Sequence, residues 1–340
     1  MNSEDELLKE WLSECRTQST RDTYTRHIRT FTDWYKQPLT EFLKLSPKEM
    51  RHTALKFQSE AQNGWKTRWG RTLKPNSIIA TLTALGSFCT FNDKTLRLKG
   101  KKIRQAIDLT SHAFTDTDLK KMFTVAGTQE KALLATLCSL GWEVSSVIAL
   151  ERTFIQNHIF KAKEERRSFI YFIDQRKKTG AIRLGILNPL AIEWITEWLK
   201  VPLERIQQSK GPLQWDTKKL FGYTTKEGVN GLIKHLARDA HVTVTGRVHT
   251  HTIRKWVMSG LSRAGFNEFQ IKFVMGKAIP VSDMTYLLTL QREVEERYPK
   301  AYTDYLNISG ETRLRLSEEK IAILERLLKA FEEGKIHIEP

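Results

Sequence analysis

The sequence predicts a mainly α-helical protein with a small β-sheet, an α+β chain built from two domains. Apolar residues recur at helical spacing through most of the chain, whereas residues 168–188 alternate weakly in polarity and contain a Thr-Gly turn. The length of 340 residues is enough for two domains of ordinary size. We place the first domain at residues 1–110, including a basic linker at its end, and the second at 114–307. A tail helix is expected over 308–340.

The first domain is expected to contain helices only. An apolar stripe over residues 7–12 begins the first helix, and Ser19 or Thr20 is expected to cap the second. A turn at residues 44–47 precedes the third helix, and Pro75 opens the fourth, because proline is favoured in the first turn of a helix.

The second domain is expected to begin with a helix whose first turn lies in residues 114–118. The alternating stretch at 168–188 predicts a β-hairpin. Helices are expected at 189–199 and through 229–236, and the tail at 317–334 has apolar residues at helical spacing. This apolar stripe has to be covered, either by the tail's own domain or by a neighbouring protomer.

The composition favours a polyanionic partner. Lys and Arg number 55 against 39 Asp and Glu, which gives a formal charge of +16. Duplex DNA would gain affinity from such an excess by counterion release. No apolar run approaches the roughly 20 residues of a membrane span, and no signal peptide opens the chain. Cys15, Cys89 and Cys138 lack zinc-site spacing, so we expect no metal site. Together these features lead us to expect a protein outside the membrane, in the cytoplasm.

The positive charge is concentrated between Gly64 and Arg104, where ten Lys or Arg stand against one acid, Asp93. Trp65 and Trp69 lie among these cations. An ordinary solvated face is the alternative, but so few counter-charges favour a surface that contacts phosphates. The candidate DNA-binding residues are Lys66, Arg68, Arg71, Lys74, Arg97, Lys99, Lys101, Lys102 and Arg104.

Four residues in the second domain suggest chemistry on a phosphodiester. His251 and Arg254 are three positions apart, so on a helix they share a face and can bind one anionic group together. Lys277 and Tyr286 follow and can bring a second cation and an oxygen nucleophile. An oxygen nucleophile among cations, without a cage of acidic metal ligands, indicates phosphoryl transfer.

This arrangement resembles the tyrosine recombinase (integrase) family, and in it the integrases of the archaeal virus and plasmid type. The family signature is His-x-x-Arg, then Gly-His or Gly-Trp, then a nucleophilic tyrosine. This chain has His-Thr-Ile-Arg at residues 251–254, Gly-Lys at 276–277 and Tyr286 nine positions after Lys277. The resemblance is loose before residue 113 and close after residue 245.

The resemblance implies a role for each of these residues. Tyr286 would attack the scissile phosphate and form a 3′-phosphotyrosine, Arg254 would bind the phosphate oxygens, and His251 would accept the tyrosine proton. Lys277 stands where the family has histidine or tryptophan, and can still donate to the phosphate. Lys178, with Lys177 as the alternate, matches a hairpin lysine that protonates the departing 5′-oxygen.

One position departs from the family pattern. The first catalytic arginine of the family lies in a Thr-Gly-x-Arg-x-x-Glu phrase, and the matching stretch has Glu143 at the arginine and Ser146 at the acid. A carboxylate repels a phosphorane, so we expect DNA binding with slow cleavage. Another cation, such as Arg152 or Arg247, could fill the site, the chain could be an inactive DNA binder, or the residue could have been altered.

The resemblance further implies a core-binding (DNA-clamp) domain followed by a catalytic domain, acting as a homotetramer on two sites of double-stranded DNA. The free protein would be a monomer or dimer, and neither ATP, a metal nor another cofactor would be needed. The product would be integration or excision of a mobile element. The alternatives are a catalytically impaired DNA-binding relative, motivated by Glu143, and strand relaxation of the type IB topoisomerase kind.

Overall fold

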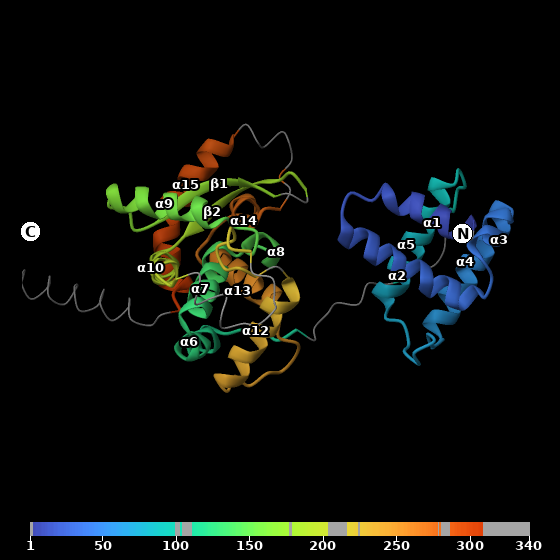
Figure 1. Ribbon diagram of the computed structural model, residues 1–340, viewed down its shortest axis with the longest axis horizontal. Coiled ribbons are helices and arrows are strands. Elements are labelled where there is room, and N and C mark those ends of the chain that lie inside the picture. Colours follow the sequence, from blue (N-terminus) through green and yellow to red (C-terminus); the bar gives the residue numbers. More distant parts are fainter. Residues whose placement is uncertain are drawn as a thin grey trace, which may run out of the picture. The chain divides into compact units, whose positions relative to one another are not determined.

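The computed structural model describes residues 3–98, 103, 111–176, 179–202, 216–223, 225–277, 279 and 286–308. The chain divides into two compact units, Met1–Leu109 and Thr110–Pro340, each with its own hydrophobic core (Figure 1). The tail helix predicted after residue 308 lies outside the described residues. No helix in the described ranges is long and apolar enough to cross a membrane.

The first unit is helical in all of its regular elements. Its helices are α1 (Ser3–Ser13), α2 (Gln18–Tyr35), α3 (Leu39–Lys44), α4 (Pro47–Gln62) and α5 (Pro75–Phe91). The four predicted helices are present, but the cap of α2 was misplaced, because Thr17 accepts the capping hydrogen bond from the Thr20 amide. The short helix α3 was not predicted. It forms because Leu39 and Phe42, three positions apart, both enter the core.

Aromatic rings form the centre of this first core. Phe31 meets Phe42 and Phe57 edge to face, with ring centroids 5.2 and 5.5 Å apart, and Trp11 meets Phe88 at 5.3 Å. Aromatic side chains bury large areas and prefer this edge-to-face geometry. The rings fix α4 against α2, and the loop that follows α4 is left at the surface of the unit.

The second unit packs helices against a small antiparallel hairpin. Its elements are α6 (Asp116–Val125), α7 (Thr128–Leu140), α8 (Val144–Val147), α9 (Arg152–Glu164), β1 (Ile170–Gln175), β2 (Ile182–Leu187), α10 (Pro189–Leu199), α12 (Lys226–Asp239), α13 (Thr250–Arg263), α14 (Glu268–Met275), α15 (Leu287–Ala301) and the π-helix η2 (Tyr302–Leu306). The strands pair from Ile170 with Leu187 to Gln175 with Ile182, which confirms the predicted hairpin. The predicted mainly helical α+β fold is thereby confirmed.

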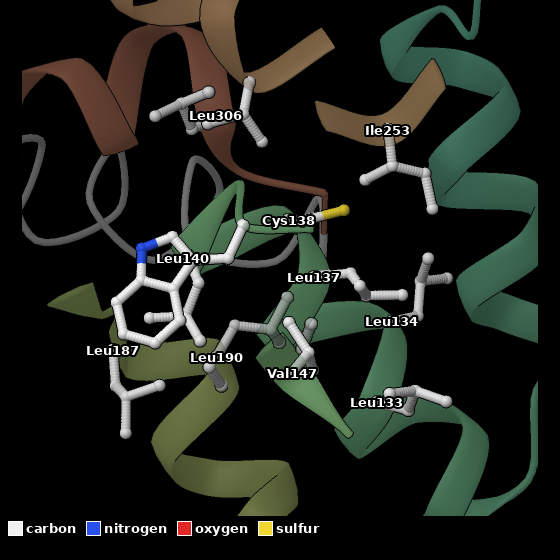
Figure 2. Close-up of a cluster of buried hydrophobic side chains, with 14 of the residues drawn as sticks. Leu133, Leu134, Leu137, Cys138, Leu140, Val147, Leu187, Leu190, Ile253 and Leu306 are labelled. Atoms are coloured by element: carbon white, nitrogen blue, oxygen red, sulfur yellow. The ribbon is translucent and has the colours of Figure 1, made fainter. Parts of the chain in front are cut away.

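Helix α7 is the centre of this unit, and every residue from Ala132 to Leu140 is buried. It packs against α10, α13 and β2. Figure 2 shows side chains of α7 among Leu187, Leu190, Ile253 and Leu306, which come from β2, α10, α13 and η2. A helix that is apolar on all sides has to be enclosed in this way. Its carboxyl end is therefore held in a fixed place.

Candidate active site

Helix α13 brings His251 and Arg254 to the carboxyl end of α7. Arg254 is only 7% exposed, and its guanidinium donates from Nη1 to the Gly141 carbonyl and from Nη2 to the Met275 carbonyl, both at 2.8 Å. A guanidinium fixed by two carbonyls presents its remaining N–H groups in a set direction. His251 lies on the exposed side of the same helix, three residues earlier.

Burial lowers the pKa of Arg254 below its ordinary value, and the Glu143 carboxylate acts in the opposite direction. Desolvation also lowers the pKa of His251 below its ordinary value of 6.5, and the positive charge of Lys255 adds to this effect. A histidine with a lowered pKa is neutral at neutral pH, so its ring can accept a proton. The arrangement therefore combines a fixed cation with a proton acceptor.

The turn between α7 and α8 carries Glu143, which the sequence resemblance aligned with the first arginine of the family. Gly141 ends α7 at φ +59°, and a Cβ there would come within 2.8 Å of a methyl carbon of Val257. Trp142 is buried and donates from its ring nitrogen to the Val274 carbonyl at 2.9 Å. Glu143 then occupies the N-cap position of α8, where its side chain makes no capping hydrogen bond. The turn is thus packed tightly against α13 and α14.

Two arginines of the hairpin, neither of them predicted from the sequence, meet this turn. Arg183 of β2 is 4% exposed and donates to the carboxylate of Asp174, its partner across the strands, and to Ser146 Oγ at 2.9 Å. Its guanidinium carbon lies 3.5 Å from the centroid of the Trp142 ring. The available sequence signal was an acid and an arginine at opposed positions of a short hairpin.

Arg176, directly after β1, forms an ion pair with Glu143. Its side chain is 15% exposed, whereas that of Glu143 is 37% exposed. Arg176, Arg183 and Glu143 all contribute to the electrostatic environment of Arg254, and Glu143 also acts on His251. The hairpin, the α7–α8 turn and α13 therefore form one charged cluster.

The two arginines that we considered as replacements for the missing cation lie elsewhere. Arg152 begins α9 and donates to the Leu199 carbonyl at 3.0 Å. Arg247 has an exposed side chain, and its backbone pairs with Ser111. Neither is among the charges that shift the pKa of Arg254 or of His251.

Tyr286 immediately precedes α15, and its side chain is 69% exposed. Lys277 is exposed as well, with Nζ 3.7 Å from the Met258 sulfur. Residues 280–285 lie outside the described residues, as do Lys177 and Lys178 of the hairpin turn. Tyr298 is fully buried and donates to the Ser139 carbonyl, and Tyr302 is 2% exposed, so both serve packing.

Four of the predicted DNA-binding cations lie in the loop between α4 and α5, which we call the basic loop (residues 63–74). They are Lys66, Arg68, Arg71 and Lys74, all of them exposed. Lys66 pairs with Thr72 through a single β-bridge. Trp69 is 65% exposed, with the Arg68 guanidinium 4.0 Å from its ring centroid. Arg97 is also exposed, whereas Lys99, Lys101, Lys102 and Arg104 lie outside the described residues.

The described ranges contain no group of three or more His, Cys, Asp or Glu placed to hold a metal ion. Cys15, Cys89 and Cys138 are free thiols. Burial raises the pKa of the Cys89 thiol to about 12. A thiol with such a pKa stays protonated, so Cys89 is a packing residue in the first unit.

No protein-family model matches the chain, and no curated protein matches it. Among solved structures, a lambda integrase dimer bound to a COC′ core site aligns over 83% of this chain and 75% of that chain, with TM-score 0.53 and 11% identity. The Tn1549 transposon integrase in complex with transposon right end DNA aligns over 87% and 99%, with TM-score 0.52 and 13% identity. The fold is that of the tyrosine recombinases. Identities this low show the fold alone.

Proposed function

We propose that this protein is a site-specific DNA recombinase that cuts and rejoins double-stranded DNA through a 3′-phosphotyrosine intermediate. The observation that carries the proposal is the buried Arg254, fixed by two backbone carbonyls beside His251, within the tyrosine recombinase fold. A guanidinium held in advance at a phosphate stabilises the charge that develops in the transition state without having to reorganise. The exposed Tyr286 is free of the core packing that engages Tyr298.

In the proposed reaction, Tyr286 Oη attacks the scissile phosphorus and the bond from phosphorus to the 5′-oxygen breaks. His251, with its lowered pKa, accepts the phenol proton. Lys178 is proposed to donate a proton to the departing 5′-oxygen, which leaves as a hydroxyl. Attack by a 5′-hydroxyl on the phosphotyrosine reverses each step and rejoins the strand. The bond energy is conserved in the intermediate, so neither ATP nor a metal cofactor enters the proposed steps.

Double-stranded DNA is the proposed partner. The charge of +16 and the exposed basic loop provide phosphate contacts. A lambda integrase tetramer bound to a Holliday junction has the same fold, with TM-score 0.51 and 12% identity. We propose residues 1–110 as the core-binding domain, 114–307 as the catalytic domain, and a homotetramer on two DNA sites in the cytoplasm. That the protein integrates or excises a mobile element of the archaeal virus or plasmid type stays a prediction.

Glu143 supports a second candidate, a DNA-binding relative that cleaves slowly or not at all. In that case the chain would bind duplex DNA but form no covalent adduct. Strand relaxation of the topoisomerase kind is a further alternative within the same chemistry. It would relax supercoiled DNA without joining two sites, so a two-site joining assay separates it from recombination.

The test is covalent capture on a pool of nicked duplexes with randomised sequence, resolved on denaturing gels. Nicked substrates release the strand beyond the cut, so the adduct accumulates. We expect Tyr286→Phe to abolish adducts and leave DNA affinity nearly unchanged, because one hydroxyl and no charge is removed. The matched control is Tyr298→Phe, which should still form adducts. Adducts that persist in Tyr286→Phe would show that the nucleophile is misassigned.

A further inference from the structure

Three consecutive residues of the α7–α8 turn are contacted by three arginines from different elements. Arg254 of α13 binds the Gly141 carbonyl, and Arg183 of β2 lies over the Trp142 ring. Arg176, at the end of β1, pairs with Glu143. The resemblance implies an arginine within this turn, at position 143. Here the turn has none, and the arginines that contact it come from other elements.

The three arginines are not equally free to bind a phosphate. Arg183 has a 5% exposed side chain and is fixed by Asp174, by Ser146 Oγ and by the Trp142 ring. Arg176 is more exposed, at 15%, and within the described part of the chain its guanidinium pairs with Glu143. A guanidinium has five donors, so one bond to a carboxylate leaves capacity for a phosphate oxygen.

The backbone of Arg176 is nevertheless fixed. Its amide donates to the Ala181 carbonyl at 2.9 Å, and its carbonyl accepts from the Gly180 amide at 2.8 Å. These bonds close the hairpin turn directly after the last pair of the ladder, Gln175 with Ile182. The side chain of Arg176 therefore starts from a defined point and is directed by its carboxylate partner toward the α7–α8 turn.

Resting on the proposed function, we propose that Arg176 supplies the phosphate-binding cation that the sequence lacks at position 143, and that Glu143 is the positioning residue that holds Arg176. The ion pair offsets the negative charge of Glu143, which would otherwise repel a phosphate, while the other N–H groups of Arg176 stay available as donors. The cluster of three arginines and two carboxylates, Glu143 and Asp174, then keeps one net positive charge. In this chain the acid lies on the α7–α8 turn, and the cation comes from the hairpin.

The proposal makes a specific prediction for Glu143→Arg, the change that would place an arginine where the resemblance implies one. An arginine introduced alone at position 143 would face Arg176, and two guanidinium groups would repel each other. The single change should therefore lower the cleavage rate instead of raising it. A double exchange, Glu143→Arg with Arg176→Glu, restores an opposite-charge pair and places the cation on the turn.

The experiment is single-turnover adduct formation with saturating full-length protein on the pool of nicked duplexes. We expect Arg176→Gln to lower the cleavage rate by about 10²–10³, the effect of losing one stabilising donor, with a small change in DNA affinity. Glu143→Gln should lower the rate less, and Glu143→Asp should retain more activity than Glu143→Gln. The double exchange should return the rate to within about tenfold of the unmodified chain.

The matched control is Arg167→Gln, which removes an arginine of the same unit that pairs with Glu165 at the surface, 2.9 Å apart. The proposal is overturned if Arg176→Gln cleaves as fast as Arg167→Gln, if Glu143→Gln is faster than the unmodified chain, or if the double exchange is no faster than Arg176→Gln. Failure of the proposed function looks different, because the unmodified chain would then give no Tyr286-dependent adduct.

Discussion

Gly276 provides a sharp test of how tightly the charged cluster is packed. It ends α14 at φ +64°, a left-handed conformation that residues with a Cβ rarely adopt. A Cβ added there would lie 2.7 Å from Cδ of Arg183. Arg183 cannot move aside easily, because Asp174 and Ser146 hold its guanidinium. Gly276→Ala should therefore strain the backbone and displace this arginine.

The magnitude follows from two separate effects. A left-handed alanine costs about 1–2 kcal/mol of folding free energy, and overpacking of a filled site costs about 1–3 kcal/mol more. Gly276→Ala should thus lower the free energy of unfolding by about 2–5 kcal/mol. It should also slow covalent capture, because the guanidinium that lies over the Trp142 ring at 3.5 Å is pushed away.

Two glycines of the same unit separate the two effects. Gly180 has φ +69°, and among the described residues its added Cβ would meet only Gln175 Nε2, at an ordinary 3.7 Å, so Gly180→Ala should show the backbone cost alone. A Cβ added at Gly231, inside α12, would meet no atom of another described element within 4 Å, and Gly231→Ala should stabilise by about 0.5–1 kcal/mol. Urea unfolding of the full chain measures all three. If Gly276→Ala is no more destabilising than Gly180→Ala, Arg183 is not held as described.

Two further predictions concern the charges of the site and of the first unit. In an NMR titration of the free protein, the pKa of His251 should lie below 6.5, fall further in Glu143→Gln, and rise in Lys255→Gln, because the carboxylate raises this pKa and the lysine lowers it. The imidazole of His251 would then become protonated, and stop accepting a proton, only as the pH falls through its lowered pKa. A measured pKa above 6.5 would contradict the role of His251 as proton acceptor. Changing the four cations of the basic loop to glutamine should reduce the log–log salt dependence of DNA binding by roughly 0.9 per lost phosphate contact. An unchanged slope in fluorescence anisotropy would show that the loop faces solvent.

The sequence determined the elements and their order because the signals for them are local. Apolar spacing predicted the long helices, and alternation with a Thr-Gly turn predicted the hairpin. The sequence placed His251 and Arg254 three residues apart on one helix, and both lie in α13. The small helix at Leu39–Lys44 was missed because six residues give too little periodicity to separate a helix from a turn. Its formation depends on burial in the core.

Only the tertiary structure decided which charges surround position 143. Arg176 is 33 residues from Glu143 in the sequence, and Arg254 is 113 residues from Gly141. In the sequence, Arg176 and Arg183 look like ordinary polar residues of a hairpin, and Arg152 and Arg247 are equally eligible cations. The choice among them depends on which side of the hairpin packs against the buried end of α7. That packing is set by the burial of apolar side chains across the whole unit, which no local pattern around a charged residue records.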